Sequence, residues 1–489
     1  MRRAQHHVIR RQVLEIAVSG AESDGLALHR RLPDICQDWL LPSLEAVLER
    51  LVPGDEHWTI DRLDIDAGTL RPDAFEKGLV DAVTQEVERF LREHAARMGS
   101  VSPMKAAELD SADGPVARRS EEQSLQRAFL HFLQTGVLPW WFHLSQGVTL
   151  EEVIRASWRA GSHEGKPRDF LVGLRAGIAT PTVRTRLVRQ FSPDFLNTLL
   201  AGNTPECASA VRDIVTELTA FGIVAHGLER LVEHVWRTAF LIEAGERPSA
   251  EMLMVETLKS MPPGADSPRA LPLRFATLLS DNDRDRSGET TGTLAREPQV
   301  LRQPATRPPQ MRAIRDEGMP RLDLEEGVYV NCAGIVLLHP FVPRLFEAVD
   351  IARDGALLES ERALSLLHFL ATGQRLAPEY DLTLAKILCN IPLESPVASR
   401  IDLTGTEEDE AAALLAAVIR HWDALGETSA EALRNTFLMR AGKLSRRGGD
   451  DVLQVERLSF DILLDQLPWG VGMIQLPWMK RMLRVEWRF

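Results

Sequence analysis

The last third of the chain opens on the apolar stretch Val328-Tyr-Val-Asn-Cys-Ala-Gly-Ile-Val-Leu-Leu-His-Pro-Phe341. It closes on two Leu-Pro-Trp copies, Leu467-Pro-Trp-Gly470 and Leu476-Pro-Trp-Met479. Apolar runs punctuated by Pro and Gly are typical of a buried core with tight turns. Because no catalytic constellation accompanies them, this stretch predicts a folded module with a structural or assembly role.

Four further blocks of sequence are informative, two between these stretches and two near the N-terminus. They are Glu379-Tyr-Asp-Leu-Thr-Leu-Ala-Lys-Ile-Leu-Cys389, His421-Trp422, His7-Val-Ile-Arg-Arg-Gln12 and Trp58-Thr-Ile-Asp-Arg-Leu-Asp-Ile-Asp-Ala-Gly68. In this order the blocks resemble the tape measure proteins of contractile injection systems, the phage-tail-like particles of bacteria. The resemblance covers both ends of the chain and only faintly the middle. Two positions depart from the pattern, Cys332 in place of a second Asn and Asn390 in place of a Gly.

The resemblance implies a non-enzymatic, length-determining assembly protein. Such a protein is expected in the lumen of the inner tube, held at the baseplate, while tube and sheath subunits polymerise around it. Its implied partners are the inner-tube, baseplate and tube-terminator proteins, it can be oligomeric inside the tube, and no cofactor is implied. The alternative is a baseplate or cap component, or a cytosolic assembly chaperone, of the same particle. A hydrolase whose site is not visible in the sequence is the third class.

The composition of the chain limits the number of domains, the class of partner and the compartment. A chain of 489 residues with 44% apolar and 26% charged residues is expected to form two or three globular domains. The net charge of −13 disfavours nucleic acid as a partner, because binding phosphates needs a basic surface. Apolar runs fall short of the roughly 20 residues that span a bilayer, so no membrane insertion is expected. Four widely spaced cysteines suit a reducing cytoplasm, from which the protein would enter the assembled particle.

The order of apolar patterns and polar stretches predicts a mainly α fold with minor β (α+β), made of modules joined by flexible linkers. The expected parts are an N-terminal α+β module (1–95), a linker (96–121), a helical middle unit (122–260), a linker rich in Pro, Arg and Asp (261–321), and a C-terminal α+β module (322–489) with the Leu-Pro-Trp motifs.

Local patterns predict the elements of the end modules. Pro42-Ser43 is expected to start a helix whose buried stripe is Leu44, Val47, Leu48 and Leu51. Residues 58–66 alternate in polarity and predict a strand, and residues 72–94 predict a second helix with Phe75, Leu79, Val83 and Val87 on one face. Strands are also expected at 328–338, near 452–464, and at 483–489.

One internal repeat is present. His131-Phe-Leu-Gln-Thr-Gly136 matches His368-Phe-Leu-Ala-Thr-Gly373, each at the end of a predicted helix. The Gly stands where a helix C-cap needs a positive φ. Two copies are too few for a solenoid. They predict a helix-turn substructure shared by the middle and C-terminal units.

The chain offers no credible catalytic, cofactor-binding or metal site. Asp64-Ile-Asp66 could place two carboxylates on one strand face, but a solvated face explains them better than a cation. The thirteen histidines include no metal-binding spacing, and His131 and His368 are expected in cores or caps. Glycine-rich nucleotide motifs and serine or cysteine nucleophile motifs are missing.

Four tryptophans are the candidate partner-binding residues. Trp469 and Trp478 belong to the Leu-Pro-Trp copies, and Trp140-Trp141 form a pair in the middle unit. Trp beside Pro gives a rigid apolar knob of the kind that dominates protein interfaces. Filling the core of each unit is the simpler interpretation, and both interpretations remain open from the sequence.

Overall fold

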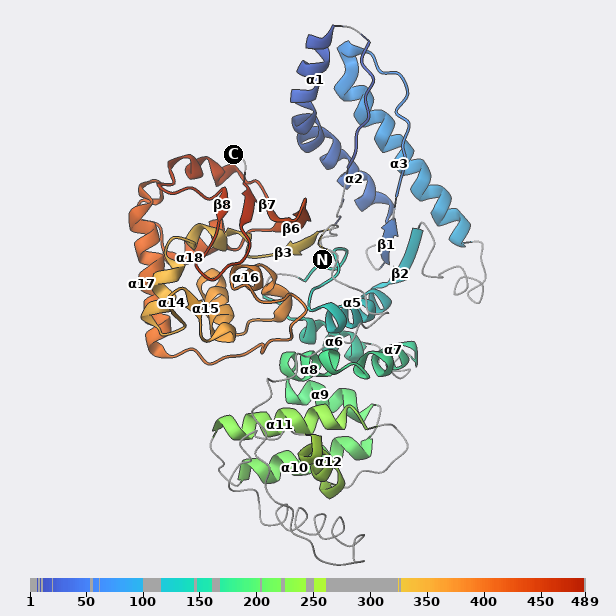
Figure 1. Cartoon of the computed structure of the whole chain (residues 1–489). Helices are drawn as coiled ribbons and strands as arrows, with labels where there is room; N and C mark the ends of the chain where they lie inside the picture. The colour runs from blue at the N-terminus through green and yellow to red at the C-terminus, as the bar shows by residue number, and fades with distance from the viewer. Residues whose placement is uncertain are drawn as a thin grey trace, which may run out of the picture. The chain divides into compact units, whose positions relative to one another are not determined.

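The computed structural model describes residues 7, 9, 12–19, 21–52, 56–60, 62–99, 116–144, 147–160, 168–202, 205–220, 225–242, 250–260, 324 and 327–487. These residues are mainly helical, with a few short strands, which confirms the predicted fold class (Figure 1). The chain divides into two compact units. The first comprises Met1–Phe129 and Leu138–Ser157, and the second comprises Leu130–Val137 and Trp158–Phe489.

The first unit encloses a small core between two helical paths. The paths are α1 (Glu22–Ile35), continued by a π-helical turn (Cys36–Leu40) and α2 (Leu41–Leu51), and α3 (Phe75–Gly99), preceded by a 3-10 turn (Pro72–Ala74). The buried core residues are Leu40, Leu44 and Val47 from the first path and Val87 and Leu91 from the second. The apolar faces predicted for both helices are therefore confirmed.

The predicted helix start at Pro42-Ser43 is wrong. The chain is already helical from Glu22, and Pro42 lies inside the continuous path. Proline has no N–H to donate to the carbonyl four residues earlier. Here the helix widens just before Pro42, and the Leu41 N–H donates to the Cys36 carbonyl five residues back. The π-turn thus carries the helix past the proline.

The strand predicted at 58–66 is present, but the observed strand begins two residues earlier and is shorter. β1 (Glu56–Ile60) pairs antiparallel with β2 (Val116–Ser120). Residues 62–66 lie outside the β1–β2 ladder. Their side chains alternate as predicted, because Leu63 and Ile65 pack on the core and the two aspartates are exposed. β2 falls inside the interval expected as the first linker, of which residues 100–115 lie outside the described residues. The division into modules and linkers therefore stays a prediction.

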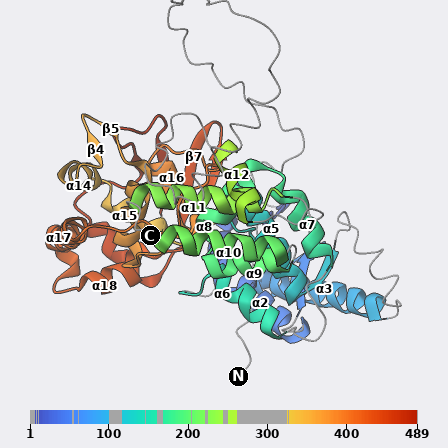
Figure 2. The same ribbon diagram turned by 90° about the horizontal axis from the view of Figure 1, so that it is seen from below.

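The second unit begins with the last turns of α5 (Glu121–Thr135), whose earlier residues belong to the first unit, as does most of α6 (Leu150–Ala160). Helices follow up to residue 260: α7 (Arg168–Ile178), α8 (Pro181–Gln190), α9 (Pro193–Ala201), α10 (Pro205–Ala220), α11 (Ala225–Ala239) and α12 (Ala250–Ser260). Figure 2 shows α10 and α11 side by side. Each buries an apolar stripe, Val211 and Ile214 on α10 and Leu231 and Val235 on α11. The predicted second linker, 261–321, lies outside the described residues.

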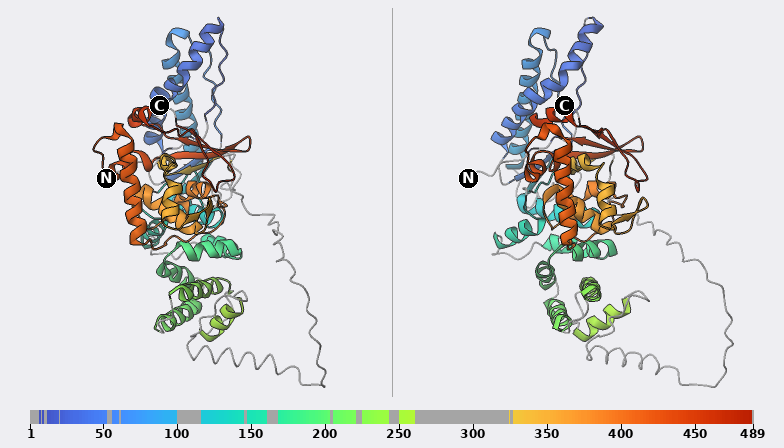
Figure 3. Two further views of the ribbon diagram at one scale, coloured as in Figure 1. Left: turned by 60° about the vertical axis from the view of Figure 1, so that its left-hand side comes forward. Right: turned by 90° about the vertical axis from the view of Figure 1, so that its left-hand side faces the viewer.

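From residue 327 the chain forms a small sheet covered by short helices. Figure 3 shows this sheet and the helices around it from two sides. The sheet order is β3-β6-β7-β9-β8, antiparallel except between β7 and β9. The strands are β3 (Val328–Val330), β6 (Gly442–Arg447), β7 (Asp450–Val455), β8 (Met473–Ile474) and β9 (Leu483–Glu486). The helices are α14 (Val342–Ala348), α15 (Ser360–Thr372), α16 (Thr383–Leu388), α17 (Gly405–His421) and α18 (Ala430–Leu433), and a hairpin joins β4 (Ala352–Arg353) to β5 (Ala356–Leu357). Trp422, fully buried at the end of α17, lies in this core.

Two predicted strands of this region extend too far. After β3 the stretch Ala333–Leu338 is a 3-10 helix, and after β7 the stretch Ser459–Gln466 is another. All six residues of the first are buried, and a continuous apolar run does not distinguish a buried strand from a buried helix. In the second, Asp461 ends the strand pattern because its buried carboxylate accepts the Leu458 N–H. The predicted terminal strand is confirmed for residues 483–486.

A buried ionic cluster joins α8 to the C-terminal helices. Glu379 accepts from Arg186 Nε at 2.9 Å and from Lys386 Nζ at 2.6 Å, and the side chains of both Arg186 and Glu379 are 0% exposed. The remaining donors are used as well. Arg186 donates to the carbonyls of Leu133 and Glu394, each at 2.6 Å. A buried charge destabilises the fold unless it is paired and its remaining hydrogen-bond donors have acceptors, as they do here.

We predict that Glu379→Ala lowers the free energy of unfolding of the second unit by about 3–5 kcal/mol, because two cations stay buried without their carboxylate. The matched control is Glu361→Ala. It removes a 2.9 Å partner of Arg189 from a partly exposed pair, and we expect a loss of about 0–1 kcal/mol. Urea unfolding followed by tryptophan fluorescence measures both. Equal losses would contradict the role assigned to the cluster.

Candidate partner-binding site

The two C-terminal candidate tryptophans are anchored on the core of the second unit. Both are half-buried, and the indole N–H of Trp469 donates to the Leu337 carbonyl at 3.0 Å and that of Trp478 to the Leu388 carbonyl at 2.8 Å. The Trp478 ring stacks on Phe346, with centroids 5.4 Å apart. Each indole therefore has a fixed orientation and one face or edge left over.

The other two candidates belong to the first unit. Trp140 and Trp141 lie in the turn after α5, and both are half-buried. The Trp141 ring meets Phe142 edge to face, with centroids 6.3 Å apart. Nothing in this geometry assigns them a partner, so their binding role stays a prediction.

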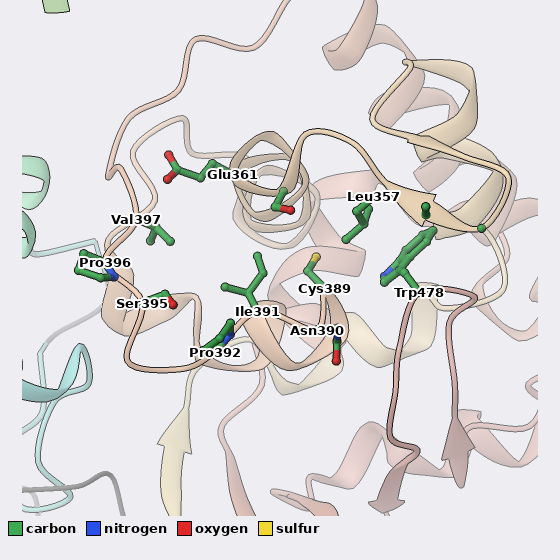
Figure 4. A pocket seen from close by; sticks show the side chains of 13 residues that line it. Leu357, Glu361, Cys389, Asn390, Ile391, Pro392, Ser395, Pro396, Val397 and Trp478 are labelled. Carbon is green, nitrogen blue, oxygen red and sulfur yellow. The ribbon is translucent and has the colours of Figure 1, made fainter. Parts of the chain in front are cut away.

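Trp478 lines an open groove in the second unit. The groove has a volume of about 570 Å³, and its wall presents polar and apolar surface in similar amounts (Figure 4). Leu357, Cys389 and Ile391 lie between Trp478 at one end and Val397 towards the other. Its polar contributors include Glu361, Asn390 and Ser395. Such a surface suits a short segment that offers both apolar and polar contacts.

Three local structures build this groove. They are the β4–β5 hairpin, the first turn of α15 and the loop of residues 389–397 after α16. In that loop Asn390 has φ +54°, a conformation that Gly and Asn adopt more readily than other residues. The departure from the family pattern at Asn390 is therefore compatible with the backbone.

The buried cluster fixes the loop that forms the groove wall. Lys386 Nζ donates to the carbonyls of Leu393 at 2.9 Å and Ser395 at 2.8 Å, and Arg186 reaches the Glu394 carbonyl between them. Gln190 on α8 donates to the Val397 carbonyl at 2.8 Å. A wall held at four successive points is preorganised, so little conformational entropy is lost when a partner binds.

The groove lacks the chemistry of an active site. Burial raises the pKa of the Cys389 thiol well above its usual range, so the thiol stays protonated. The Glu361 carboxylate is paired with Arg189. Within the described part of the chain, no group of three or more His, Cys, Asp or Glu residues could hold a metal ion.

Among the titratable side chains of the second unit with displaced pKa values are His368 and Asp381. Burial lowers the pKa of His368 on α15 to about 4. Burial raises the pKa of Asp381 to about 6, although the Asn331 amide, 2.9 Å away, donates to it and opposes the rise. In the first unit, Asp64 and Asp66 are exposed, and one pairs with Arg62 while the other accepts the Gly68 N–H. These bonds agree with the solvated interpretation of the two aspartates.

Comparison with known families decides the identity of the chain. The model described as contractile injection system tape measure protein matches residues 6–487. The chain belongs to this family. The match includes the middle of this tape measure protein, where the sequence blocks gave only a faint resemblance. No curated protein and no solved structure matches the chain.

Membership makes this tape measure protein a structural component of an injection particle, with other particle proteins as its partners. Over the described ranges, no helix is both long enough and apolar enough to cross a membrane. The sequence pointed to Trp478 but missed the loop that completes its groove. The two prolines of Ile391-Pro-Leu-Glu-Ser-Pro396, directly after a predicted helix, were the only signal of a shaped loop.

The pKa values of His368 and Asp381 predict opposite effects of pH. Between pH 6.5 and about 4 the unfolded chain protonates His368 while the folded unit does not, so His368 lowers stability as the pH falls. Between about 6 and 3.8 the folded unit protonates Asp381 first, so Asp381 raises stability as the pH falls.

We therefore expect His368→Gln to lose less stability than the unsubstituted chain between pH 7 and 4, by up to about 3 kcal/mol. Asp381→Asn should lose more. Urea unfolding at each pH gives the three curves. Parallel curves would show that neither residue has the protonation state assigned to it.

Proposed function

We propose that this tape measure protein is a non-enzymatic, length-determining assembly protein. It lies in the lumen of the inner tube, held at the baseplate, while subunits polymerise until a terminator caps the tube. The observation that carries the proposal is the family match over residues 6–487. A groove shaped for binding, with a protonated thiol and a paired carboxylate, supports the non-enzymatic part.

The folded second unit narrows which residues can act as the span. The ionic cluster ties α8 to Glu379, so the middle helices and the C-terminal sheet belong to one folded unit. Extending the middle helices would expose the cluster and separate its charges. We therefore place the adjustable span in residues 261–321, the second predicted linker, and assign docking to the folded unit.

The second candidate is a baseplate or cap component, or a cytosolic assembly chaperone, of the same particle. It is favoured by the same cluster, because a unit held by saturated buried charges resists threading through a narrow tube. Length does not separate the two candidates. A helical chain of 489 residues reaches about 730 Å and an extended one about 1,600 Å, both the scale of a contractile tail.

The test inserts the same 40-residue polar segment at two places. At Gly288 it lengthens the proposed span, and we expect longer particles, by about 60 Å if the insert is helical and about 130 Å if it is extended. Between Gly448 and Gly449 it lengthens only the exposed turn of the β6–β7 hairpin, and we expect no change. Negative-stain electron microscopy measures both.

Each pattern of lengths has one meaning. Lengthening from Gly288 alone establishes a ruler with a folded docking unit. Equal lengthening from both sites means that the whole chain is extended in the tube. If neither insertion changes the particle length and the particle yield is normal, the length-determining role is rejected and the second candidate, an assembly component, is supported.

The groove is tested by filling it. Ala356 is exposed on β5 and lines the groove, so Ala356→Trp should occupy it, and we expect at least a tenfold drop in particle yield. The control Leu358→Trp places the same ring two residues away at a position that is 54% exposed and not part of the wall. Melting temperatures verify that both variants fold. Normal yield with Ala356→Trp would exclude the groove as the docking site.

A further inference from the structure

The internal repeat forms the same local structure twice in the second unit. At the end of α5 the Thr135 hydroxyl donates to the His131 carbonyl, and at the end of α15 the Thr372 hydroxyl donates to the His368 carbonyl, both at 2.8 Å. The glycine that follows has φ +82° at Gly136 and +73° at Gly373. The predicted C-caps are thus confirmed in both copies.

An arginine from another helical segment covers each helix end. Arg186 Nη1 donates to the carbonyls of Leu133 at 2.6 Å and Gln134 at 3.1 Å. In the second copy Arg434 donates to the carbonyls of Leu370 at 3.0 Å and Phe369 at 3.4 Å. Cations are favoured at helix C-termini, where the carbonyls lack partners in the helix.

The cap glycine leaves room beside each guanidinium. A Cβ added at Gly136 would lie 3.1 Å from Arg186 Nη2, and one added at Gly373 would lie 3.3 Å from Arg434 Nη1. A cap glycine and the guanidinium beside it therefore form one structural unit in each copy, which we call a socket. The first socket consists of Gly136 and Arg186, and the second of Gly373 and Arg434.

The two sockets differ in what fills them. Glu379 enters the first, where its Oε1 lies 2.5 Å from the position of a Gly136 Cβ and its Oε2 accepts from Arg186. Gly136 and Arg186 are consequently buried. In the second socket Gly373 is exposed and Arg434 is half-buried. No carboxylate among the described residues is bonded to Arg434.

The charged groups around the second socket do not fill it. Glu431, one turn before Arg434 on the same helical path, is exposed and attracts the guanidinium only at longer range. Arg375, two residues after Gly373, is paired with Glu408 at 2.7 Å. Burial lowers the pKa of Arg434, and the more distant Glu431 carboxylate opposes this effect without cancelling it.

We propose that the socket of Gly373 and Arg434 receives a carboxylate side chain, presented on a loop of another protein of the particle. The occupant of the first socket defines the chemistry: Glu379 follows a proline, and a lysine on the next short helix binds its other oxygen. A second copy of this chain cannot supply that loop while folded, because its Glu379 is fully buried in its own first socket.

This proposal rests on the proposed role in particle assembly, and the test separates the two. A photo-crosslinking residue, p-benzoylphenylalanine, replaces Gln374, which is exposed next to the socket. Cells that assemble particles are irradiated, the full chain is purified, and its crosslinked peptide is identified by mass spectrometry. Recovery of the chain in purified particles is scored separately and reports on the proposed function.

We expect one crosslinked particle protein, joined within about five residues of a Glu or Asp. Arg434→Gln should lower the crosslink yield at least tenfold, because a charge-assisted hydrogen bond is lost, and Arg375→Gln should leave it unchanged. Since Arg434 also caps α15, the mapped acid of the partner is changed to Gln as well, and the same tenfold loss is expected with this chain untouched.

Three outcomes would overturn the socket. They are a crosslink that is independent of Arg434, a crosslink mapped to a segment without an acidic residue, and no loss when the partner's acid becomes Gln. A chain that is found in particles but gives no crosslink also rejects the socket while the proposed function stands. A chain that is missing from particles but gives the expected crosslink rejects the lumen location while the socket stands.

Discussion

A single buried carboxylate holds the second unit together. Glu379 accepts from Arg186, 193 positions earlier in the chain, and from Lys386, seven positions later. The two cations then use their remaining donors on backbone carbonyls from two segments, the end of α5 and the loop after α16. Placing three charges out of water is unfavourable unless each is paired and hydrogen-bonded. Helix α8, the end of α5 and the segment around α16 must therefore take up their final positions together before this part of the core closes.

This constraint also shapes the surface. The loop of residues 389–397 follows its path because Lys386, Arg186 and Gln190 hold its carbonyls. The same loop is one wall of the Trp478 groove. A site built on a saturated polar network is rigid, and rigidity favours binding because the wall is already ordered. Core and groove are thus parts of one arrangement.

In the proposed function, the folded second unit and the adjustable span have different tasks. A ruler needs residues whose length can change freely, and docking needs a surface of fixed shape. In the proposed function, the second unit supplies the fixed shape through the groove and through the open socket of Gly373 and Arg434. Because one socket is filled from within the chain and the other is open, the same physical contact can serve first in folding and then in assembly.

The sequence predicted what depends on neighbours along the chain. Helical stripes such as Leu44 and Val47, the glycine caps at Gly136 and Gly373, and the mainly α class all follow from local pattern and from backbone preferences. The ordered blocks also indicated the family. The sequence did not predict that residues 333–338 are helical. An apolar run that is buried on every side has no alternation of polar and apolar residues to distinguish a strand from a helix.

The tertiary structure decided what depends on distant partners. Arg186 and Glu379 look like ordinary surface residues in the sequence, and only the fold brings them to 2.9 Å and removes both from water. The groove likewise needs a hairpin, a helix start and a loop to converge on Trp478. Local propensity acts over a few residues, whereas burial and charge pairing are set by the whole core. For this reason the sequence alone determined the family, most of the elements and the choice of Trp478, and the fold alone determined which distant residues surround that tryptophan.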